Sequence, residues 1–356
     1  MIKVGIIGCG KIADQHANHI QNITDCEIVG VCDNEELMAK QMYQRYKVKH
    51  YYCDVNKLLE DAHPDIIHIT TPPQSHFNLG KLCLESGCHV YIEKPFALNT
   101  DEAEKLIALA VEKNLKMTVG HNAQFSNVSK EMRGLIKNGF LGGSPLHMES
   151  IWCYDLRNER YAKTLLGDKK HWIYGLPGKL LQNILPHGVS KIAEFLTSDN
   201  PEVIAYGFTS NILQKIGITE IIDELRVIIH DDNCTAYFTF SSQIGPPLRQ
   251  FRVYGPQNSI ILDEHHQTLI KVKTKNYKSY LNYFIPPRLF AKQYLANSRN
   301  NIKKFLQRDL YVDYGMRFLI ESFYRSVAEN TPVPISYREI LLTTKIMDDI
   351  FRQINV

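Results

Sequence analysis

Short apolar runs alternate with amphipathic stretches through the first third of the chain. The apolar runs lie within residues 3–8, 27–33, 65–73 and 88–95. A helical pattern over residues 11–22 follows the first run, and another over residues 35–46 follows the second. Strands that alternate with helices pair in parallel, because the chain must cross over before each strand returns. This part of the sequence therefore predicts a parallel, doubly wound α/β sheet.

The pattern changes after residue 120. One helical pattern covers residues 128–137, and alternating apolar segments then predict antiparallel strands at residues 147–154, 203–209, 221–230, 234–241 and 250–254. Apolar residues at helical spacing predict two final helices, over residues 315–329 and 337–353. We therefore expect a nucleotide-binding domain over residues 1–122 and, over residues 123–356, an α+β domain built on an open, mostly antiparallel sheet.

The first predicted turn has the small residues that a dinucleotide requires. Gly8 allows a sharp turn, Gly10 allows the backbone to approach a pyrophosphate, and Ala13 allows tight helix packing. A diphosphate would bind the amides of Lys11 and Ile12, because the first amides of a helix lack intrahelical partners and lie at its positive end. The alternative is an ordinary strand-to-helix turn.

An acidic residue, Asp33, ends the second predicted strand. Its carboxylate can accept hydrogen bonds from both ribose hydroxyls of an adenosine, and it would repel a 2′-phosphate. Asn34 follows it, and no arginine stands in the next few positions. The pattern favours NAD as the cofactor over NADP.

Two polar segments follow later predicted strands. Thr71, Pro72 and His76 follow one strand, and Glu93 and Lys94 follow the next. Cofactors and substrates bind at the carboxyl edge of such a sheet. The Lys94 ammonium could hydrogen-bond a substrate hydroxyl and stabilise developing alkoxide charge.

Composition and charge exclude some classes of protein. The 356 residues carry a formal net charge of +3, and no apolar stretch is long enough to span a membrane. The eight cysteines form no CxxC pair, and the fourteen histidines form no HxxxH or HExxH run, so we expect no metal. The chain enters a strand at once without a signal peptide, which favours the cytoplasm.

The motifs GxGxxA at residues 8–13, TPPxxH at residues 71–76 and EKPxxxxxxEAxxL at residues 93–106 resemble those of a known family. It is the glucose-fructose oxidoreductase / inositol dehydrogenase / rhizopine catabolism (Gfo/Idh/MocA) family. The resemblance continues through residues 120–122, 138–143 and 330–335. It implies an N-terminal Rossmann domain, and a C-terminal domain whose open sheet supports substrate binding and often subunit contacts.

The resemblance also implies catalytic positions in the second domain. His187 matches the family's catalytic histidine, whose ordinary pKa suits it to take a hydroxyl proton. Asn183 stands where most members carry an aspartate, and an amide can only orient its neighbours by hydrogen bonds. His121, Trp172 and Gln182 are further substrate-site candidates, with Trp152 and Tyr154 as aromatic residues that could equally belong to the core.

Residues 271–308 contain ten lysines and arginines and no acid, and the rest of the chain carries 31 basic against 38 acidic residues. On a helix from about residue 291, five apolar residues share an arc of about 120°: Tyr294, Leu295, Ile302, Phe305 and Leu306. This insertion could pack on its own domain or on a neighbouring subunit. Alternatively, it could bind a diphosphate-bearing or lipid-linked sugar at an anionic membrane surface. No recognition motif supports nucleic acid.

We therefore expect an NAD-dependent dehydrogenase that oxidises a ring hydroxyl of a sugar or nucleotide-linked sugar, with Lys94, His187 and Asn183 at its catalytic site. A homo-oligomer, dimer or tetramer, is expected. Two alternatives stay open. One is redox-neutral elimination or glycoside cleavage assisted by bound NAD, and the other is a non-catalytic NAD-binding regulator.

Overall fold

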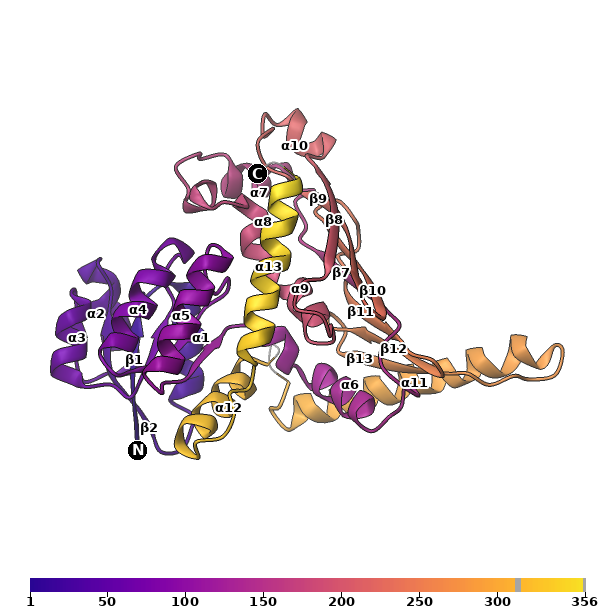
Figure 1. The fold of residues 1–356 in the computed structure, drawn as a ribbon, viewed down its shortest axis with the longest axis horizontal. Helices are drawn as coiled ribbons and strands as arrows, with labels where there is room; N and C mark the ends of the chain where they lie inside the picture. Colours follow the sequence, from indigo (N-terminus) through magenta and orange to yellow (C-terminus); the bar gives the residue numbers. More distant parts are fainter. Residues whose placement is uncertain (311–314, 355–356) are drawn as a thin grey trace. The chain divides into compact units, whose positions relative to one another are not determined.

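The computed structural model describes residues 1–310 and 315–354 in two compact units (Figure 1). Unit 1 comprises Met1–His121, Gly175–Gly178 and Met316–Asp348, and unit 2 comprises Asn122–Tyr174, Lys179–Gly315 and the residues from Asp349 onward. The second domain expected over residues 123–356 differs from unit 2, because residues 316–348 group with the N-terminal unit. Helix α12 (Met316–Ala328) packs against α1 (Lys11–Ile20) and buries Leu319 and Phe323.

Unit 1 is built on a six-stranded parallel sheet with the order β3-β2-β1-β4-β5-β6. Its strands are β1 (Ile2–Ile7), β2 (Cys26–Cys32), β3 (Tyr51–Tyr52), β4 (Ile66–Ile69), β5 (His89–Ile92) and β6 (Met117–Val119). Between them run α1, α2 (Glu36–Tyr46), α3 (Val55–Ala62), the short η1 (Pro73–Ser75), α4 (His76–Glu85) and α5 (Thr100–Glu112). The predicted doubly wound sheet is confirmed.

The strand order of unit 1 reverses at β1, which pairs with β2 on one side and β4 on the other. The chains leaving β1 and β4 therefore diverge, and ligands of doubly wound sheets bind in the crevice that this creates at the carboxyl ends. The interior residues of both strands are fully buried because helices cover both faces, as a run of Val and Ile predicts.

Unit 2 is built on a seven-stranded sheet with the order β13-β12-β11-β7-β10-β9-β8. Its strands are β7 (His147–Cys153), β8 (Glu202–Phe208), β9 (Glu224–Asp231), β10 (Cys234–Ser241), β11 (Arg249–Tyr254), β12 (Asn258–Asp263) and β13 (Thr268–Lys273). The expected mostly antiparallel sheet is confirmed, and the exception is the pair β7 and β10, which run parallel. These two strands are distant in the chain, and the helices and strands between them form the crossover that parallel pairing requires.

Helix α6 (Asn127–Lys137) contacts β12 of this sheet, and α9 (Pro186–Ala193) contacts β7. The unit also contains η2 (Asn122–Phe125), α7 (Glu159–Leu166), α8 (Lys179–Ile184) and α10 (Asn211–Lys215), and η3 (Trp172–Gly175) ends at its boundary. Helix α13 (Tyr337–Gln353) belongs to unit 1 through Asp348. The α/β and α+β classes predicted for the two parts are confirmed.

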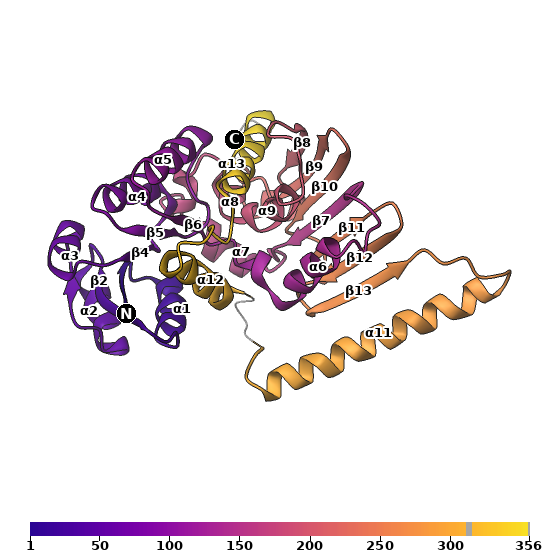
Figure 2. The ribbon, with the colours of Figure 1, turned by 60° about the horizontal axis from the view of Figure 1, so that its bottom comes forward.

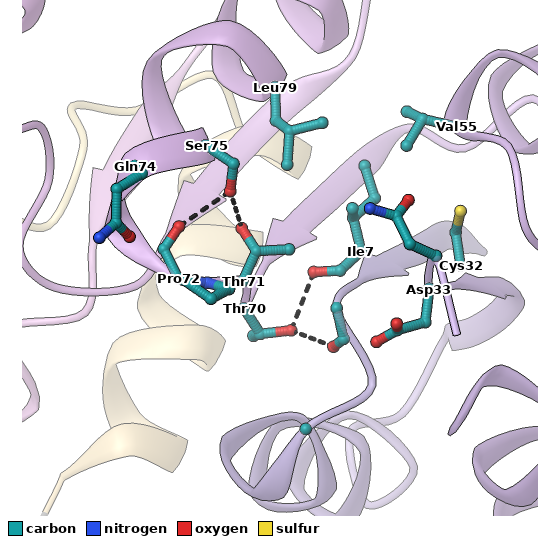
Figure 3. Close-up of a pocket in the computed structure, with 13 residues that line it drawn as sticks. Ile7, Cys32, Asp33, Val55, Thr70, Thr71, Pro72, Gln74, Ser75 and Leu79 are labelled. Carbon is teal, nitrogen blue, oxygen red and sulfur yellow. Dashed lines mark hydrogen bonds between the residues drawn. The ribbon is translucent and has the colours of Figure 1, made fainter. Parts of the chain in front are cut away.

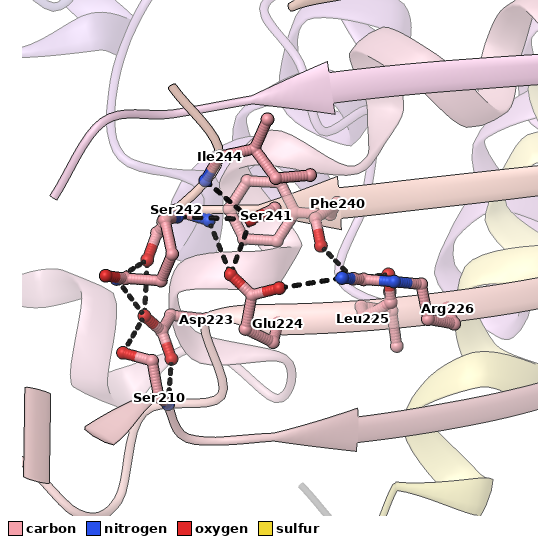
Figure 4. Close-up of polar contacts among 10 residues, drawn as sticks. Ser210, Asp223, Glu224, Leu225, Arg226, Phe240, Ser241, Ser242 and Ile244 are labelled. Carbon is pink, nitrogen blue, oxygen red and sulfur yellow. Dashed lines mark hydrogen bonds and ion pairs between the residues drawn. The ribbon is translucent and has the colours of Figure 1, made fainter. Parts of the chain in front are cut away.

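Two buried carboxylates hold the loops at one end of β9 and β10 (Figure 4). Asp223 accepts hydrogen bonds from the backbone N–H and the hydroxyl of Ser210, at 2.6 and 2.7 Å. Glu224 accepts from the Ser241 hydroxyl at 2.5 Å and from the Ser242 N–H at 3.1 Å. Since buried carboxylates need such donors, this network stabilises the end of the sheet.

Most of the basic segment forms one long helix, α11 (Leu281–Leu306), beside the edge strand β13 (Figure 2), and the first three residues of the segment end β13. The helix was expected from about residue 291 and begins ten residues earlier. The prediction stopped short because Pro286 and Pro287 lie inside the helix and lack the N–H that an interior helical residue donates.

Candidate nucleotide site and catalytic residues

The glycine turn between β1 and α1 leaves room for an anion. Gly8 has φ +91°, and a Cβ added there would lie 2.7 Å from Thr71 Cγ2 and 2.9 Å from the Thr71 backbone nitrogen. Gly10 caps α1, and a Cβ on it would meet no atom within 4 Å. Gly8 is thus required by close packing, whereas a side chain at Gly10 would fill open space in front of the first helical amides.

The carboxylate of Asp33 is held in place by two backbone amides. The Cys9 N–H donates to Oδ2 at 2.7 Å, and the Glu35 N–H donates to Oδ1 at 2.9 Å. Each oxygen keeps a lone pair for a further donor. The glycine turn and the end of β2 therefore fix the position of this acid.

A cavity of about 420 Å³ lies at this edge of the sheet (Figure 3). It is lined by Ile7, Gly8, Gly10, Cys32, Asp33, Asn34, Val55, Thr70, Thr71, Pro72, Gln74, Ser75 and Leu79. Five residues predicted to bind the cofactor are thus brought together. Five others, Lys11, Ile12, His76, Glu93 and Lys94, do not belong to this lining. The sequence analysis did not predict Val55 and Leu79 as part of this site. Both lie on helices, where an apolar residue is most simply interpreted as part of the core.

Hydroxyl groups tie the loops of the cavity together. The Thr70 hydroxyl donates to the carbonyls of Ile7 and Gly8, at 3.0 and 2.6 Å. The Ser75 hydroxyl donates to the Thr71 hydroxyl at 2.7 Å. These bonds join the ends of β1 and β4, so the cavity wall is ordered by the protein itself.

His76 joins the two polar segments at the sheet edge. It is fully buried, with Nδ1 2.8 Å from the Pro95 carbonyl oxygen and Nε2 3.0 Å from the Thr71 carbonyl oxygen. Burial lowers the pKa of this imidazole below its ordinary value. The contacts show His76 fixing one loop against the other.

A buried chain of polar side chains leads to Glu93, and sequence reasoning missed it. His16 Nε2 lies 2.9 Å from Glu93 Oε1, and His16 Nδ1 lies 2.7 Å from His68 Nδ1. The chain ends where the Tyr324 hydroxyl lies 2.8 Å from His68 Nε2. Burial alone would raise the pKa of Glu93, but the hydrogen bond and charge of His16 hold it below its ordinary value.

Lys94 and His121 also belong to unit 1. Burial lowers the pKa of the Lys94 ammonium, and the neighbouring Glu93 carboxylate opposes that shift. Burial lowers the pKa of His121 to about 3. His121 is therefore a neutral imidazole at physiological pH.

In unit 2, His187 lies in the first turn of α9 and stacks on Trp152 of β7, with ring centroids 4.7 Å apart and planes 11° apart. The Arg249 guanidinium lies over the same indole at 4.8 Å. Lys191, also over this indole, forms a buried ion pair with Glu264. The Trp152 indole thus orients the His187 ring. The sequence alone did not show whether Trp152 belongs to the site or to the core.

The remaining candidates lie on neighbouring elements of unit 2. Asn183 and the buried Gln182 are on α8, and Trp172 is on η3 with its ring 5.4 Å from that of His171. Gly188 follows His187, and any Cβ there would collide with the Phe238 ring of β10. Glycine at that position lets α9 approach the sheet.

Among residues 1–310 and 315–354, no cluster of three or more His, Cys, Asp or Glu side chains could hold a metal ion. No helix in the same residues combines the length and apolar character that crossing a bilayer requires.

A doubly wound sheet with a glycine turn, an amide-held acid and a cavity at the switch point defines a dinucleotide-binding unit. Residues 2–121 match the model described as the oxidoreductase family with an NAD-binding Rossmann fold. Over these residues the match confirms the predicted resemblance to the Gfo/Idh/MocA family and the predicted cofactor class.

Two relatives similar to this chain are named as dehydrogenases of a glucoside and of a UDP-linked sugar. UDP-N-acetylglucosamine 3-dehydrogenase of Acidithiobacillus ferrooxidans is 31% identical over 149 residues, 42% of this chain and 44% of that protein. D-glucoside 3-dehydrogenase of Escherichia coli K12 is 29% identical over 142 residues, 40% of each chain. The matched stretch thus spans about two fifths of these curated relatives.

A solved structure extends the likeness of fold to the whole chain. The WlbA dehydrogenase from Bordetella pertussis, in complex with NADH and UDP-GlcNAcA, has a TM-score of 0.78 at 14% identity. The aligned region covers 99% of this chain and 95% of the WlbA chain. At that identity the likeness concerns the fold alone.

Proposed function

We propose that this protein is an NAD-dependent dehydrogenase that oxidises a ring hydroxyl of a sugar or nucleotide-linked sugar. The observation that carries the proposal is the Asp33 carboxylate, held by two amides in a cavity that also contains Gly8 and Gly10. The names of the sugar and UDP-sugar dehydrogenases similar to this chain support the substrate class.

The residues of the cavity fit NAD. Asp33 would accept the adenosine ribose hydroxyls, and the open space at Gly10 would admit the diphosphate to the amides of Lys11 and Ile12. Thr71 and Pro72 would line the cofactor on the β4 side. Bound NAD would supply a hydride acceptor.

The proposed catalytic residues each contribute one task. Lys94 would donate a hydrogen bond to the substrate hydroxyl and stabilise the charge that grows on its oxygen. His187 would accept the hydroxyl proton, with its ring oriented by the stack on Trp152. Asn183 would orient the substrate or His187 through its amide, since it cannot take up a proton. His121, Trp172 and Gln182 are proposed to contact the sugar.

A thermal-shift screen of sugars and nucleotide sugars, with NAD present, tests the substrate class, because a ligand that binds only the folded state raises the melting temperature. A positive compound is then assayed for NADH formation. Lys94→Ala and His187→Ala should each lower turnover by a factor on the order of 100 while NAD still binds. Lys105→Ala is the matched control, because Lys105 is exposed on α5 and pairs with Asp101.

Other outcomes would assign a different function. Near-native turnover in either variant would remove that residue from the proposed site. Substrate consumed without accumulating NADH would indicate a redox-neutral elimination or glycoside cleavage. Tight NAD binding without turnover of any compound would indicate a regulator.

A further inference from the structure

Helix α11 is attached to unit 2 through its polar side. The Asn297 side chain accepts from the Leu269 N–H at 3.1 Å and donates to the Leu269 carbonyl at 3.0 Å. Gln293 makes the same pair of bonds with Lys271, at 2.8 and 3.1 Å. Asn301, one turn further on, donates to the His266 carbonyl at 3.0 Å. These amides satisfy free backbone groups of the edge strand β13, so the helix meets this strand through its polar side.

The apolar side of α11 is exposed along its whole length. No residue of the helix is buried, and Phe305 and Leu306 are 69% and 75% exposed. The other large exposed side chains of the helix are Leu281, Tyr283, Phe284, Leu289, Tyr294, Leu295 and Ile302. The insertion attaches to its own domain, as one alternative predicted, but it does so through its amide side, and its apolar face stays exposed.

Basic side chains flank the apolar side. At 100° per residue, Arg288, Lys292 and Arg299 fall within a narrow arc that borders Leu295 and Leu306. Lys292 also lines a cavity of about 460 Å³ with Lys271, Lys273 and Lys275 of the β13 side. Lys271 pairs with Glu131 at 3.2 Å, and residues 271–308 themselves contain no acid.

We propose that α11 docks this protein on an anionic membrane surface, with its apolar side among the acyl chains and its basic side against lipid headgroups. A helix with an apolar face and a cationic border binds at the bilayer interface without crossing it. Because residues 271–308 contain no acidic side chain, no part of this segment would be repelled by a negatively charged membrane surface. Pairing of α11 with the same helix of a second copy would instead bring like charges together.

The test uses the full-length protein and sedimentation with vesicles of phosphatidylcholine alone or of phosphatidylcholine with phosphatidylglycerol. The protein should sediment with the anionic vesicles at about 0.05 M salt, and much less at about 0.5 M salt, where the charges are screened. It should stay in solution with the neutral vesicles.

Two variants of α11 address its two sides. The triple variant Lys292→Glu/Arg299→Glu/Lys303→Glu should lower partitioning to anionic vesicles at least about 100-fold. The double variant Ile302→Gln/Phe305→Gln should lower it at least about tenfold through the lost apolar burial. All five side chains are exposed, so both variants should fold and bind NAD as the wild type does.

The matched control is Lys137→Glu/Lys163→Glu/Lys215→Glu, which changes the charge of exposed positions on α6, α7 and α10 by the same amount. It should retain most of the vesicle binding. The proposal is overturned if the wild type fails to sediment with anionic vesicles at low salt, or if the control loses as much binding as the α11 charge variant. It is also overturned if Ile302→Gln/Phe305→Gln lowers the molecular mass in solution, since the apolar side would then be a contact between copies.

Discussion

At the scale of single residues, Asp33 is expected to decide the cofactor. Its two oxygens already accept from Cys9 and Glu35, which leaves a fixed negative charge facing the cavity. That charge would repel a 2′-phosphate and bind a ribose diol. We predict that NAD binds at least about tenfold tighter than NADP, a difference of about 1.4 kcal/mol. Calorimetric titration measures both constants, and equal affinities would contradict the assigned role.

His121 should make the folded state sensitive to acid. Its pKa is about 3 in the folded protein against an ordinary value of 6.5. Between these values the unfolded chain binds a proton that the folded chain does not. The free energy of unfolding should therefore decrease as the pH is lowered between these values, by up to about 1.4 kcal/mol per pH unit.

Urea unfolding of the wild type and of His121→Gln, at about pH 7.5 and about pH 5, isolates this contribution. The wild type should lose more stability than the variant on acidification, because glutamine does not titrate. The other buried histidines are common to both proteins and cancel in the comparison. Parallel losses would show that His121 is protonated in the folded state.

At the scale of elements, the join between α11 and β13 depends on amide side chains. The variant Gln293→Ala/Asn297→Ala removes the partners of the Leu269 and Lys271 backbone groups and should lower stability by about 1–3 kcal/mol. Hydrogen exchange should become faster at those two amides. Asn300→Ala is the matched control, since Asn300 is exposed on the same helix. Unchanged exchange in the double variant would mean that α11 does not protect the strand.

At the scale of the whole molecule, the outer face of the seven-stranded sheet carries an apolar patch. Ile228 of β9 is directly opposite Ile204 of β8 and Tyr237 of β10, and all three side chains are exposed. Cross-strand neighbours of this kind form a continuous surface, and such patches mark contacts between proteins. We predict a homo-oligomer that uses this face.

Light scattering on Ile204→Glu/Ile228→Glu should report a lower molecular mass than the wild type, because two charges would enter the contact. Leu37→Glu/Val111→Glu places the same charges at exposed apolar positions of unit 1 and should leave the mass unchanged. A wild-type protein that is already monomeric would remove the proposed role of the face.

Local patterns predicted much of unit 1 because its signals are short-range. The glycine turn, the acid at the end of β2 and the polar segments after β4 and β5 lie where the spacing placed them. The chain from Glu93 through His16 and His68 to Tyr324 could not be predicted. Its members come from four separate segments of the chain. A single buried histidine is interpreted as a core residue until its partners are known.

The sequence by itself determined the parallel Rossmann sheet, the position of Asp33 at a strand end and the amphipathic character of α11, since each depends on residues near one another in the chain. Only the tertiary structure decided that β7 pairs in parallel with β10, that His187 stacks on Trp152 and that residues 316–348 join unit 1. It also decided which side of α11 meets the sheet. These outcomes depend on contacts between segments that are distant in the chain. A local sequence pattern does not give the relative free energies of the alternative contacts.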